Sequence, residues 1–439
     1  MKRRILVLNA GSSSLKYALY DAVGRKIQRV KARGVVECIG QPVNATIKHS
    51  IVDEDTGVTK THKTIVKEME DRKEAITGTK GVRNESGGYA VAFNTCLRLL
   101  KDTVPRDGKE LTIHGVGHRV VHGGESMSSS RLIDDVVLTA IKRASPLAPL
   151  HNPANLLGIE TAMSSLPAPN TAHCAVFDTA FHATIPPHAF MYALPIELYK
   201  EHGIRKYGFH GTSHQYILEE SARFLNKRVD TMNMIVCHLG AGSSVCCIKN
   251  GQSIDTSMGL TPLEGLVMST RSGDIDPSVV FYLMDELGLS KSEVHDLLNK
   301  KSGWFGLCGH TDAREIEQRA ERGEELSQLA RQVMVHRIRK YLGAYLLNLG
   351  GKLDAVVFTA GLGENWASLR ELCMRDLEGF GIEVDRAKNA SVEKTGIEGC
   401  NDVSTFVSQV RIFVIPTDEE KHIAKQVLQL INYEGDGGD

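Results

Sequence analysis

The chain has almost no net charge and no long apolar run, and these two absences exclude several classes of partner. Its 52 lysines and arginines balance 53 aspartates and glutamates, giving a net charge of −1. Without a basic field there is no electrostatic case for nucleic-acid binding. No apolar run reaches the roughly 18 residues that a membrane-spanning helix needs. The run behind the basic Met1–Arg4 is only Ile5–Leu8, too short for a secretory signal. We expect a cytoplasmic protein that binds neither nucleic acid nor membrane.

Paired cysteines and metal-binding spacings are missing as well. The nine cysteines are odd in number, lie scattered in apolar runs and include no Cys-x-x-Cys pair, so we expect buried thiols rather than disulfides or a zinc site. His118 and His122, and again His210 and His214, are four residues apart. Neither pair has the glutamate of a zinc-protease motif, and on a strand this spacing does not make a ligand pair. We expect no dedicated histidine metal site.

What is present begins with a polar turn between two apolar strands. Ile5–Leu8 predicts a buried strand and Leu15–Tyr20 a second one. The turn Ala10–Ser14 offers backbone N–H groups, little side-chain bulk and three hydroxyls, and Lys16 adds a positive charge. Such a turn is suited to hold phosphate. On this stretch alone, an ordinary hairpin with a serine-rich turn remains the alternative.

The same pattern returns in the second half of the chain. Met234–Gly251 again has an apolar strand, then Ala-Gly-Ser-Ser, then an apolar strand, and Asn250-Gly251 predicts a tight turn into Gln252–Asp255. A chain of 439 residues is long enough for two domains. The repeat therefore indicates two related halves, each presenting one turn to a chain of phosphates.

Four charged or titratable residues stand out by their surroundings in the sequence. Arg119 interrupts the apolar run Leu111–Gly124, so it must be paired or must face a cleft; a buried salt bridge and an oxyanion clamp are both open. Asp178 ends the apolar strand Ala172–Phe177. His210 lies between glycines ahead of a predicted helix, and Arg271 has small neighbours in a long loop.

Helix signals frame these positions. We predict Asn152 as the cap of a helix with Pro153 in its first turn, a capping box at Ser290, and a terminal helix from Glu419. A strand over Asp354–Thr359 should lead into a glycine turn and a helix capped by Asn365, a suitable place for a ribose or adenine.

Taken together, six blocks of the sequence resemble the signature blocks of the acetate kinases, in the order of that family and over nearly the whole chain. These blocks are Asn9–Lys16, Gly117–Gly124, Phe177–His182, Tyr207–His214, Thr270–Pro277 and Thr359–Asn365. Only Ala22–Thr112, longer than is usual in the family, lies outside them.

The resemblance implies an α/β fold shared with hexokinase, actin and the heat-shock chaperone ATPases. It consists of two duplicated ribonuclease-H-like domains, each with a mixed central sheet flanked by helices, and an active site in the cleft between them. The expected acetate- and phosphate-binding domain is 1–179 plus 419–439, and the expected nucleotide-binding domain is 180–418. The implied enzyme is a homodimeric acetate kinase that uses Mg2+ (or Mn2+) with ATP and acetate as substrates.

The resemblance also assigns roles to residues. Asn9 and Glu419 help to hold the metal; Asp178, Arg119, His210 and Arg271 form the catalytic set, with Arg119 orienting the acetate carboxylate. Val121, Leu150, Phe209 and Pro262 match the pocket for the acetate methyl group. Nucleotide and phosphate contacts are expected from Ser12, Ser14, Lys16, His238, Leu239, Gly240, Ala241, Gly242, Asp312, Ala313, Arg314, Gly361, Leu362, Gly363 and Asn365.

Elementary chemistry agrees with these roles. A carboxylate is already nucleophilic near neutral pH, so the task is to bring two anions together and neutralise the charge on the transferring group. We therefore give Asp178 an electrostatic or metal-linked role rather than that of an obligatory base. On this evidence, Arg119→Ala or Arg271→Ala should abolish most turnover and leave the fold intact.

Three positions depart from the family pattern: Ala241 replaces a usual Asn, Ala313 a usual aromatic residue, and Asp418 an Asn before the catalytic glutamate. Gly361 and Leu362 keep the adenosine pocket open, which favours ATP over pyrophosphate as donor. The alternatives are a kinase for a longer carboxylate such as propionate or butyrate, a pyrophosphate-dependent enzyme and, more remotely, a non-catalytic nucleotide-binding clamp.

Overall fold

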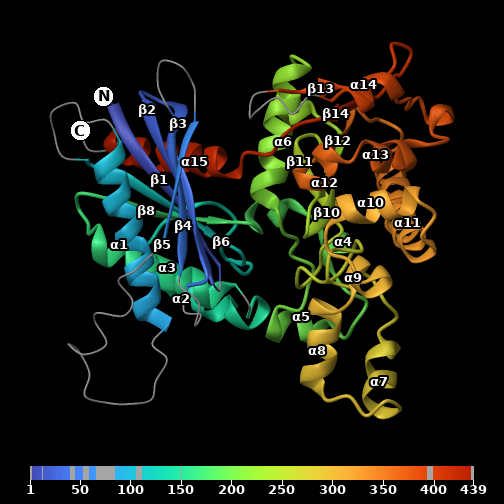
Figure 1. The fold of residues 1–439 in the computed structure, drawn as a ribbon, viewed down its shortest axis with the longest axis horizontal. Coiled ribbons are helices and arrows are strands. Elements are labelled where there is room, and N and C mark those ends of the chain that lie inside the picture. Colours follow the sequence, from blue (N-terminus) through green and yellow to red (C-terminus); the bar gives the residue numbers. More distant parts are fainter. Residues whose placement is uncertain are drawn as a thin grey trace. The chain divides into compact units, whose positions relative to one another are not determined.

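The computed structural model describes residues 2–11, 13–39, 45–52, 59–65, 85–104, 111–149, 151–392 and 399–436. The chain divides into two compact units (Figure 1). Unit 1 comprises Met1–Ala180 and Glu419–Asp439, and unit 2 comprises Phe181–Asp418.

Unit 1 is built on a mixed sheet whose eight described strands have the order β5-β4-β3-β2-β1-β6-β8-β7. The strands are β1 (Lys2–Gly11), β2 (Ser14–Val23), β3 (Lys26–Glu37), β4 (Thr46–Val52), β5 (Thr59–Ile65), β6 (Gly115–Val120), β7 (Arg131–Leu132) and β8 (Ala172–Phe177). Strands β1 to β5 form an antiparallel meander, whereas β6 and β8 continue from β1 in parallel.

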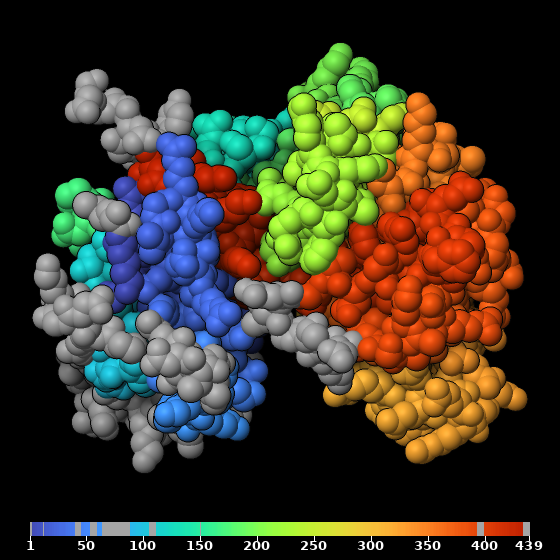
Figure 2. All heavy atoms as spheres, turned by 90° about the horizontal axis from the view of Figure 1, so that it is seen from above, coloured from blue at the N-terminus to red at the C-terminus, as the bar shows by residue number. Residues whose placement is uncertain are grey.

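Alternation along the strands of unit 1 directs apolar side chains to two separate cores. Leu6 and Leu8 of β1 pack with α1 (Glu85–Thr103) and α3 (Asn152–Ser165), whereas Ile5 and Val7 pack with α15 (Glu419–Asp436). A further helix, α2 (Asp135–Ala144), packs with α3 over the end of β6. Figures 1 and 2 show the red C-terminal helix α15 beside the blue N-terminal strands, so the two ends of the sequence share one core.

Unit 2 has a second mixed sheet, with the order β11-β10-β9-β12-β14-β13 among its described strands. The strands are β9 (Met234–Leu239), β10 (Ser243–Lys249), β11 (Gln252–Thr256), β12 (Ala355–Thr359), β13 (Asn401–Asp402) and β14 (Arg411–Val414). The main helices on its two faces are α6 (Gly211–Phe224) and α11 (Glu325–Asn348). The other helices are α4 (Pro187–Phe190), α5 (Ile196–His202), α7 (Ser278–Asp285), α8 (Lys291–Lys300), α9 (Gly303–Cys308), α10 (Ala313–Glu321), α12 (Ala360–Asn365), α13 (Ala367–Met374) and α14 (Arg386–Ala390).

The two sheets repeat one topology. In unit 1 the order β3-β2-β1-β6-β8-β7 is antiparallel over its first three strands, parallel from β1 to β8, and antiparallel again at β7. In unit 2 the strands β11-β10-β9-β12-β14-β13 show the same sequence of directions. The repeated Ala-Gly-Ser-Ser hairpin is thus the start of a duplicated α/β unit, as the sequence predicts. Unit 1 differs by the added strands β4 and β5, which belong to the long segment Ala22–Thr112.

Local signals were mostly accurate, with two errors. Ser290 forms the predicted capping box, and Asn250 and Gly251 both have positive φ in the tight turn. Asn152, however, is the first helical residue of α3 rather than its cap, and its side chain instead binds the backbone of His122 and Ile141. Asn365 ends α12 and donates to the Gly361 carbonyl, so it does not cap a following helix. Among the described residues, no helix is both long and apolar enough to span a membrane.

Candidate active site

In unit 1, residues predicted to bind the metal ion and the acetate carboxylate lie at the ends of three neighbouring parallel strands. The register pairs Leu8 of β1 with His118 of β6, so Asn9 and Arg119 each follow by one residue. It also pairs Val120 with Phe177, and Asp178 follows at the end of β8, where its N–H donates to the Val120 carbonyl over 2.9 Å. This is the carboxyl edge at which open α/β sheets bind ligands.

Arg119 forms a two-pronged ion pair with Asp178. Its Nε donates to Oδ1 over 3.0 Å and its Nη2 to Oδ2 over 2.6 Å. The Asp178 side chain is only 1% exposed, whereas that of Arg119 is 20% exposed. Burial disfavours the Arg119 cation, but Asp178 and Glu419 outweigh it and raise the pKa of the guanidinium. The buried salt bridge that the sequence left open is therefore present, on an arginine that keeps part of its surface accessible.

Glu419 completes this cluster from the first turn of α15. One carboxylate oxygen lies 3.6 Å from Arg119 Nε. Burial raises the pKa of Glu419 to about 7; the charge of Arg119 opposes the rise, and the charges of Asp178 and Glu420 add to it. Two carboxylates competing for one arginine form a site with spare negative charge, which is suited to a cation.

The turn after β1 is held in place by a buried asparagine of α3. Asn155 donates to the Ala10 carbonyl over 2.7 Å and accepts from the Val121 N–H over 3.1 Å. A side chain at Gly158 would approach the Ala10 Cβ to 2.7 Å, so α3 packs directly on this turn. Ser14 is half-buried and Lys16 is exposed on β2, while Ser12 lies outside the described residues.

In unit 2, the repeated turn Gly240–Gly242 lies beside the guanidinium of Arg271. Arg271 is half-buried, and burial lowers its pKa. Its Nη1 donates to the Pro262 carbonyl over 2.5 Å, and its Nη2 would lie 2.8 Å from a Cβ placed on Gly242. Throughout the described part of the chain, no carboxylate forms an ion pair with Arg271, so this guanidinium is available for an anion.

His210 lies on the same turn. It precedes α6 in the left-handed conformation, with φ 58°, and its ring stacks on His238 at a centroid distance of 4.1 Å. His210 Nε2 would be 3.5 Å from a Cβ on Gly242. A side chain at position 242 would therefore meet both predicted catalytic groups, and glycine leaves that space open. Not all of the turn faces outward, because the Gly240 N–H donates to the Gly242 carbonyl and to Ser243.

A cavity of about 710 Å³ in unit 2 brings together seven of the predicted nucleotide residues. It is lined by Ala241, Asp312, Ala313, Arg314, Gly361, Leu362 and Asn365, and also by Trp304, Thr311, Glu317 and Trp366. Its volume suits a nucleoside-sized ligand. His238, Leu239, Gly240, Gly242 and Gly363 are not part of this lining; the first four lie on the adjoining strand and turn, and Gly363 lies in α12.

With this geometry in view, the comparisons identify the family. The sequence profile of the acetokinase family matches residues 4–425. The chain belongs to the acetokinase family. An acetate kinase from Thermotoga sp. (strain RQ2) is 45% identical over 431 residues, covering 98% of this chain and 98% of that protein.

Solved structures agree. Porphyromonas gingivalis acetate kinase superposes with a TM-score of 0.83 at 38% identity, covering 98% of this chain and 100% of that one. A propionate kinase from Francisella tularensis subsp. tularensis SCHU S4 gives a TM-score of 0.82 at 40% identity, with the same coverage. The mixed α/β fold of two duplicated ribonuclease-H-like domains, predicted from the resemblance, is confirmed.

Sequence reasoning missed the two tryptophans. They are the only tryptophans in the chain, and both line the 710 Å³ cavity, with Trp304 1% exposed and Trp366 3% exposed. Trp366 Nε1 donates to Ser368 over 3.0 Å, and Ser368 donates to Glu317 over 2.6 Å. The signal that could have identified them is their rarity, because the sequence contains only two tryptophans among 439 residues. They supply aromatic surface in a cavity where Ala313 lacks the family's usual aromatic ring.

The predicted methyl pocket is only partly described. Val121 is buried in unit 1, whereas Phe209 is buried and Pro262 half-buried in unit 2; Leu150 lies outside the described residues. The Phe209 carbonyl accepts a hydrogen bond from His182, and the Pro262 carbonyl accepts one from Arg271. The pocket remains a prediction.

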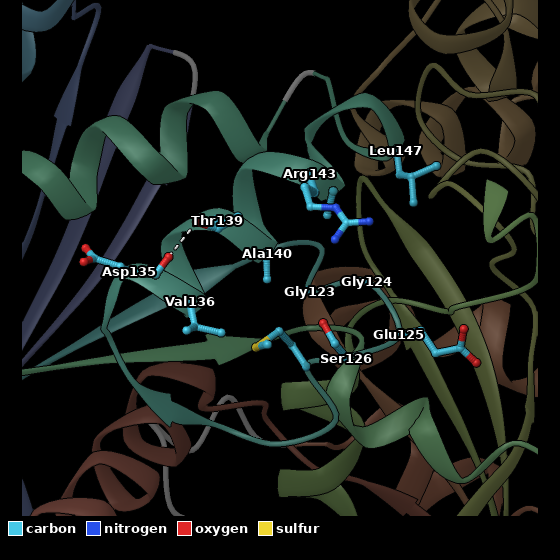
Figure 3. Close-up of a pocket in the computed structure, with 12 residues that line it drawn as sticks. Gly123, Gly124, Glu125, Ser126, Asp135, Val136, Thr139, Ala140, Arg143 and Leu147 are labelled. Carbon is cyan, nitrogen blue, oxygen red and sulfur yellow. Dashed lines mark hydrogen bonds between the residues drawn. The ribbon is translucent and has the colours of Figure 1, made fainter. Parts of the chain in front are cut away.

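A second cavity, of about 650 Å³, lies in unit 1 beside the Gly123-Gly124 turn (Figure 3). Figure 3 shows Val136 and Ala140 of α2 on one side and Ser126 on the other, with Arg143 and Leu147 toward one end. It contains none of the residues predicted from the sequence, and we assign it no role.

Proposed function

We propose that this protein is an ATP-dependent acetate kinase that transfers the terminal phosphoryl group of ATP directly to acetate, giving acetyl phosphate and ADP. The observation that carries the proposal is Arg271, a half-buried cation with no carboxylate partner among the described residues, beside His210 and the glycine turn. An unpaired, partly buried guanidinium is arranged to receive a multiply charged anion.

The chain's own residues supply the charge neutralisation that phosphoryl transfer needs. Arg271 and His210 stabilise the oxygens of the transferring group, and Arg119 orients the acetate carboxylate, which attacks in line without a covalent enzyme intermediate. Asp178 holds Arg119 in a fixed orientation through two hydrogen bonds. No strong base is needed because acetate is already ionised.

Mg2+, or Mn2+ in its place, fits the oxygen donors at the carboxyl edge of unit 1. Asp178 and Glu419 flank one guanidinium, and burial raises the pKa of Glu419, with the charges of Asp178 and Glu420 adding to the rise. Asn9 and Glu419 would hold the ion, since Mg2+ is typically bound by few protein ligands together with substrate phosphates. When bound, it would neutralise phosphate charge.

ATP is the donor because the second unit offers space for a nucleoside. The 710 Å³ cavity with two tryptophan walls would be superfluous for pyrophosphate. Ala241 and Ala313 both line it, so the two departures from the family pattern act on the nucleoside part of the donor.

Propionate is the second candidate acceptor, because a propionate kinase is as similar in structure as an acetate kinase. One methylene changes binding in an apolar pocket by only about 1–3 kcal/mol. Discrimination between acetate and propionate is therefore expected to be modest.

The enzyme acts as a homodimer in the cytoplasm. Helix α7 has no buried residue, and Phe281 and Tyr282 are 64% and 60% exposed. An exposed apolar helix favours association with a second copy. Phe281→Glu should therefore yield monomers in a sedimentation experiment, and an unchanged dimer would place the interface elsewhere.

The state of the cysteines supports the cytoplasm as the compartment. All nine cysteines are free thiols, as a reducing compartment favours.

A hydroxamate assay for acyl phosphate tests the proposal. Acetate, propionate and butyrate serve as acceptors, with ATP, GTP and pyrophosphate as donors. Acetyl phosphate from ATP is the expected product. Product from pyrophosphate alone would refute the ATP assignment, and no product from any donor would refute the kinase activity.

A further inference from the structure

The Ser244 hydroxyl lies between two histidine rings beside the phosphate turn. His210 Nδ1 is 3.0 Å from Ser244 Oγ, and His214 Nε2 is 2.9 Å from the same oxygen. Ser244 and His214 are both 0% exposed, whereas His210 is half-buried. The residue before α6, a residue in the first turn of α6 and one position of β10 thus meet at a single oxygen.

The Ser244 hydroxyl can donate one hydrogen bond and accept two. If both rings donated to it, its own proton would be buried without an acceptor, because no other described group is hydrogen-bonded to Ser244 Oγ. Two arrangements therefore remain. In the first, His214 Nε2–H donates to Ser244, and Ser244 donates to His210 Nδ1. In the second, His210 Nδ1–H donates to Ser244, and Ser244 donates to His214 Nε2. The two arrangements place the His210 proton on opposite sides of its ring.

The far side of His214 decides between them. His214 Nδ1 is buried, and no described polar atom lies within hydrogen-bonding distance of it. The second arrangement would place an N–H there, an orphan buried donor of a kind that folded proteins rarely tolerate. The first leaves only a lone pair unsatisfied.

The surroundings keep His214 neutral. Burial lowers its pKa well below the ordinary value, and His182 and His238 add to this effect. Both rings contact His214 edge-on, at centroid distances of 5.6 and 6.2 Å. A doubly protonated His214, which would allow other arrangements, is therefore disfavoured.

We propose that Ser244 and His214 are positioning residues that fix His210 in the tautomer with its proton on Nε2. That atom faces Gly242, next to Arg271 Nη2. His210 then presents an N–H donor, rather than a lone pair, to the oxygens of the transferring phosphoryl group. The catalytic role of the tautomer rests on the proposed kinase function, whereas the tautomer itself does not.

The tautomer is tested on substrate-free protein labelled with 15N-histidine. In long-range 1H–15N spectra, assigned by His210→Gln and His214→Gln, both residues should show a protonated Nε2 and an unprotonated Nδ1. Ser244→Ala should convert His210 to a mixture of tautomers. A protonated Nδ1 on His210 in the wild-type spectrum would overturn the inference, whatever the activity of the enzyme.

The role is tested by kinetics. Ser244→Ala should lower kcat about ten- to hundredfold, as loss of an outer hydrogen-bond partner typically does, with the KM values for ATP and acetate nearly unchanged. Ser244→Thr retains the hydroxyl and should recover much of the rate. His214→Gln, which keeps a donor at the Nε2 position, should retain more activity than His214→Leu.

Ser221→Ala is the matched control. It removes a different fully buried hydroxyl, which lies in α6 and has no hydrogen-bond partner among the described residues. It should leave kcat unchanged. Wild-type kcat in Ser244→Ala would overturn the positioning role. Absence of acyl phosphate from the wild-type enzyme would instead refute the proposed function, while the spectra alone still decide the tautomer.

Discussion

The two arginines that we propose to be catalytic should differ sharply in what their removal does to stability. From the sequence, Arg119→Ala and Arg271→Ala are expected to behave alike, losing activity but not the fold. The structure separates them, because Arg119 neutralises Asp178, which is 1% exposed, whereas Arg271 pairs with no described carboxylate. Arg119→Ala would remove the two-pronged cationic partner of the buried Asp178 carboxylate.

Removal of one partner from a buried ion pair typically costs about 3–5 kcal/mol. Because Arg119 is 20% exposed, we expect the lower end, about 3 kcal/mol. For a unit of about 200 residues this corresponds to a fall in Tm of about 6–12 °C. Arg271→Ala should change Tm little, since among the described residues it leaves only the Pro262 carbonyl without its donor. Both variants should lose about 10²–10³-fold in kcat.

Differential scanning calorimetry in metal-free buffer measures the stability, and the hydroxamate assay measures turnover. The decisive variant is Arg119→Ala combined with Asp178→Asn. Removing the buried Asp178 charge should restore most of the lost Tm without restoring activity. A double variant that melts no higher than Arg119→Ala, or an Arg119→Ala protein as stable as wild type, would refute the argument that this ion pair stabilises unit 1.

Three further predictions follow from other parts of the structure. ADP should change the tryptophan fluorescence, because Trp304 and Trp366 both line the 710 Å³ cavity, whereas pyrophosphate should not; unchanged emission at saturating ADP would place the nucleoside elsewhere. Gly117→Ala should destabilise unit 1 by about 1–3 kcal/mol, because the added Cβ would lie 2.6 Å from Ile423 of α15. Gly343→Ala is the control and should not be destabilising, because a Cβ at position 343 meets open space. Equal melting curves for the two variants would contradict this packing. The free energy of unfolding should also fall as the pH drops below about 6.5, because only the unfolded chain then protonates the buried histidines whose pKa is lowered in the folded protein. Each such histidine should contribute up to about 1.4 kcal/mol per pH unit. These histidines are His49, His118, His173 and His214. Replacing His49 with Gln should reduce the slope measured by urea unfolding, and an unchanged slope would exclude its contribution.

Local features of this protein were legible in the sequence. The repeated strand–turn–strand and the capping box at Ser290 both depend on residues within a few positions of one another. Their periodicity and hydrogen bonding are set by backbone geometry alone, so the pattern suffices. The duplication of the sheets could be inferred for the same reason, since each half repeats its own local signals.

Contacts between distant residues were decided only by the tertiary structure. From the sequence, Arg119 could either form a buried salt bridge or face a cleft. The parallel pairing of β6 with β8 decides this, because it places Asp178 against Arg119. Ser244 looked like one more serine of a phosphate turn, until β10 and α6 brought it between His210 and His214. Sequence pattern fixes which face a side chain takes, but strand order and helix docking determine which partner it meets. Ion pairs, tautomers and cavities depend on that partner, and so they follow from the folded chain rather than from the pattern.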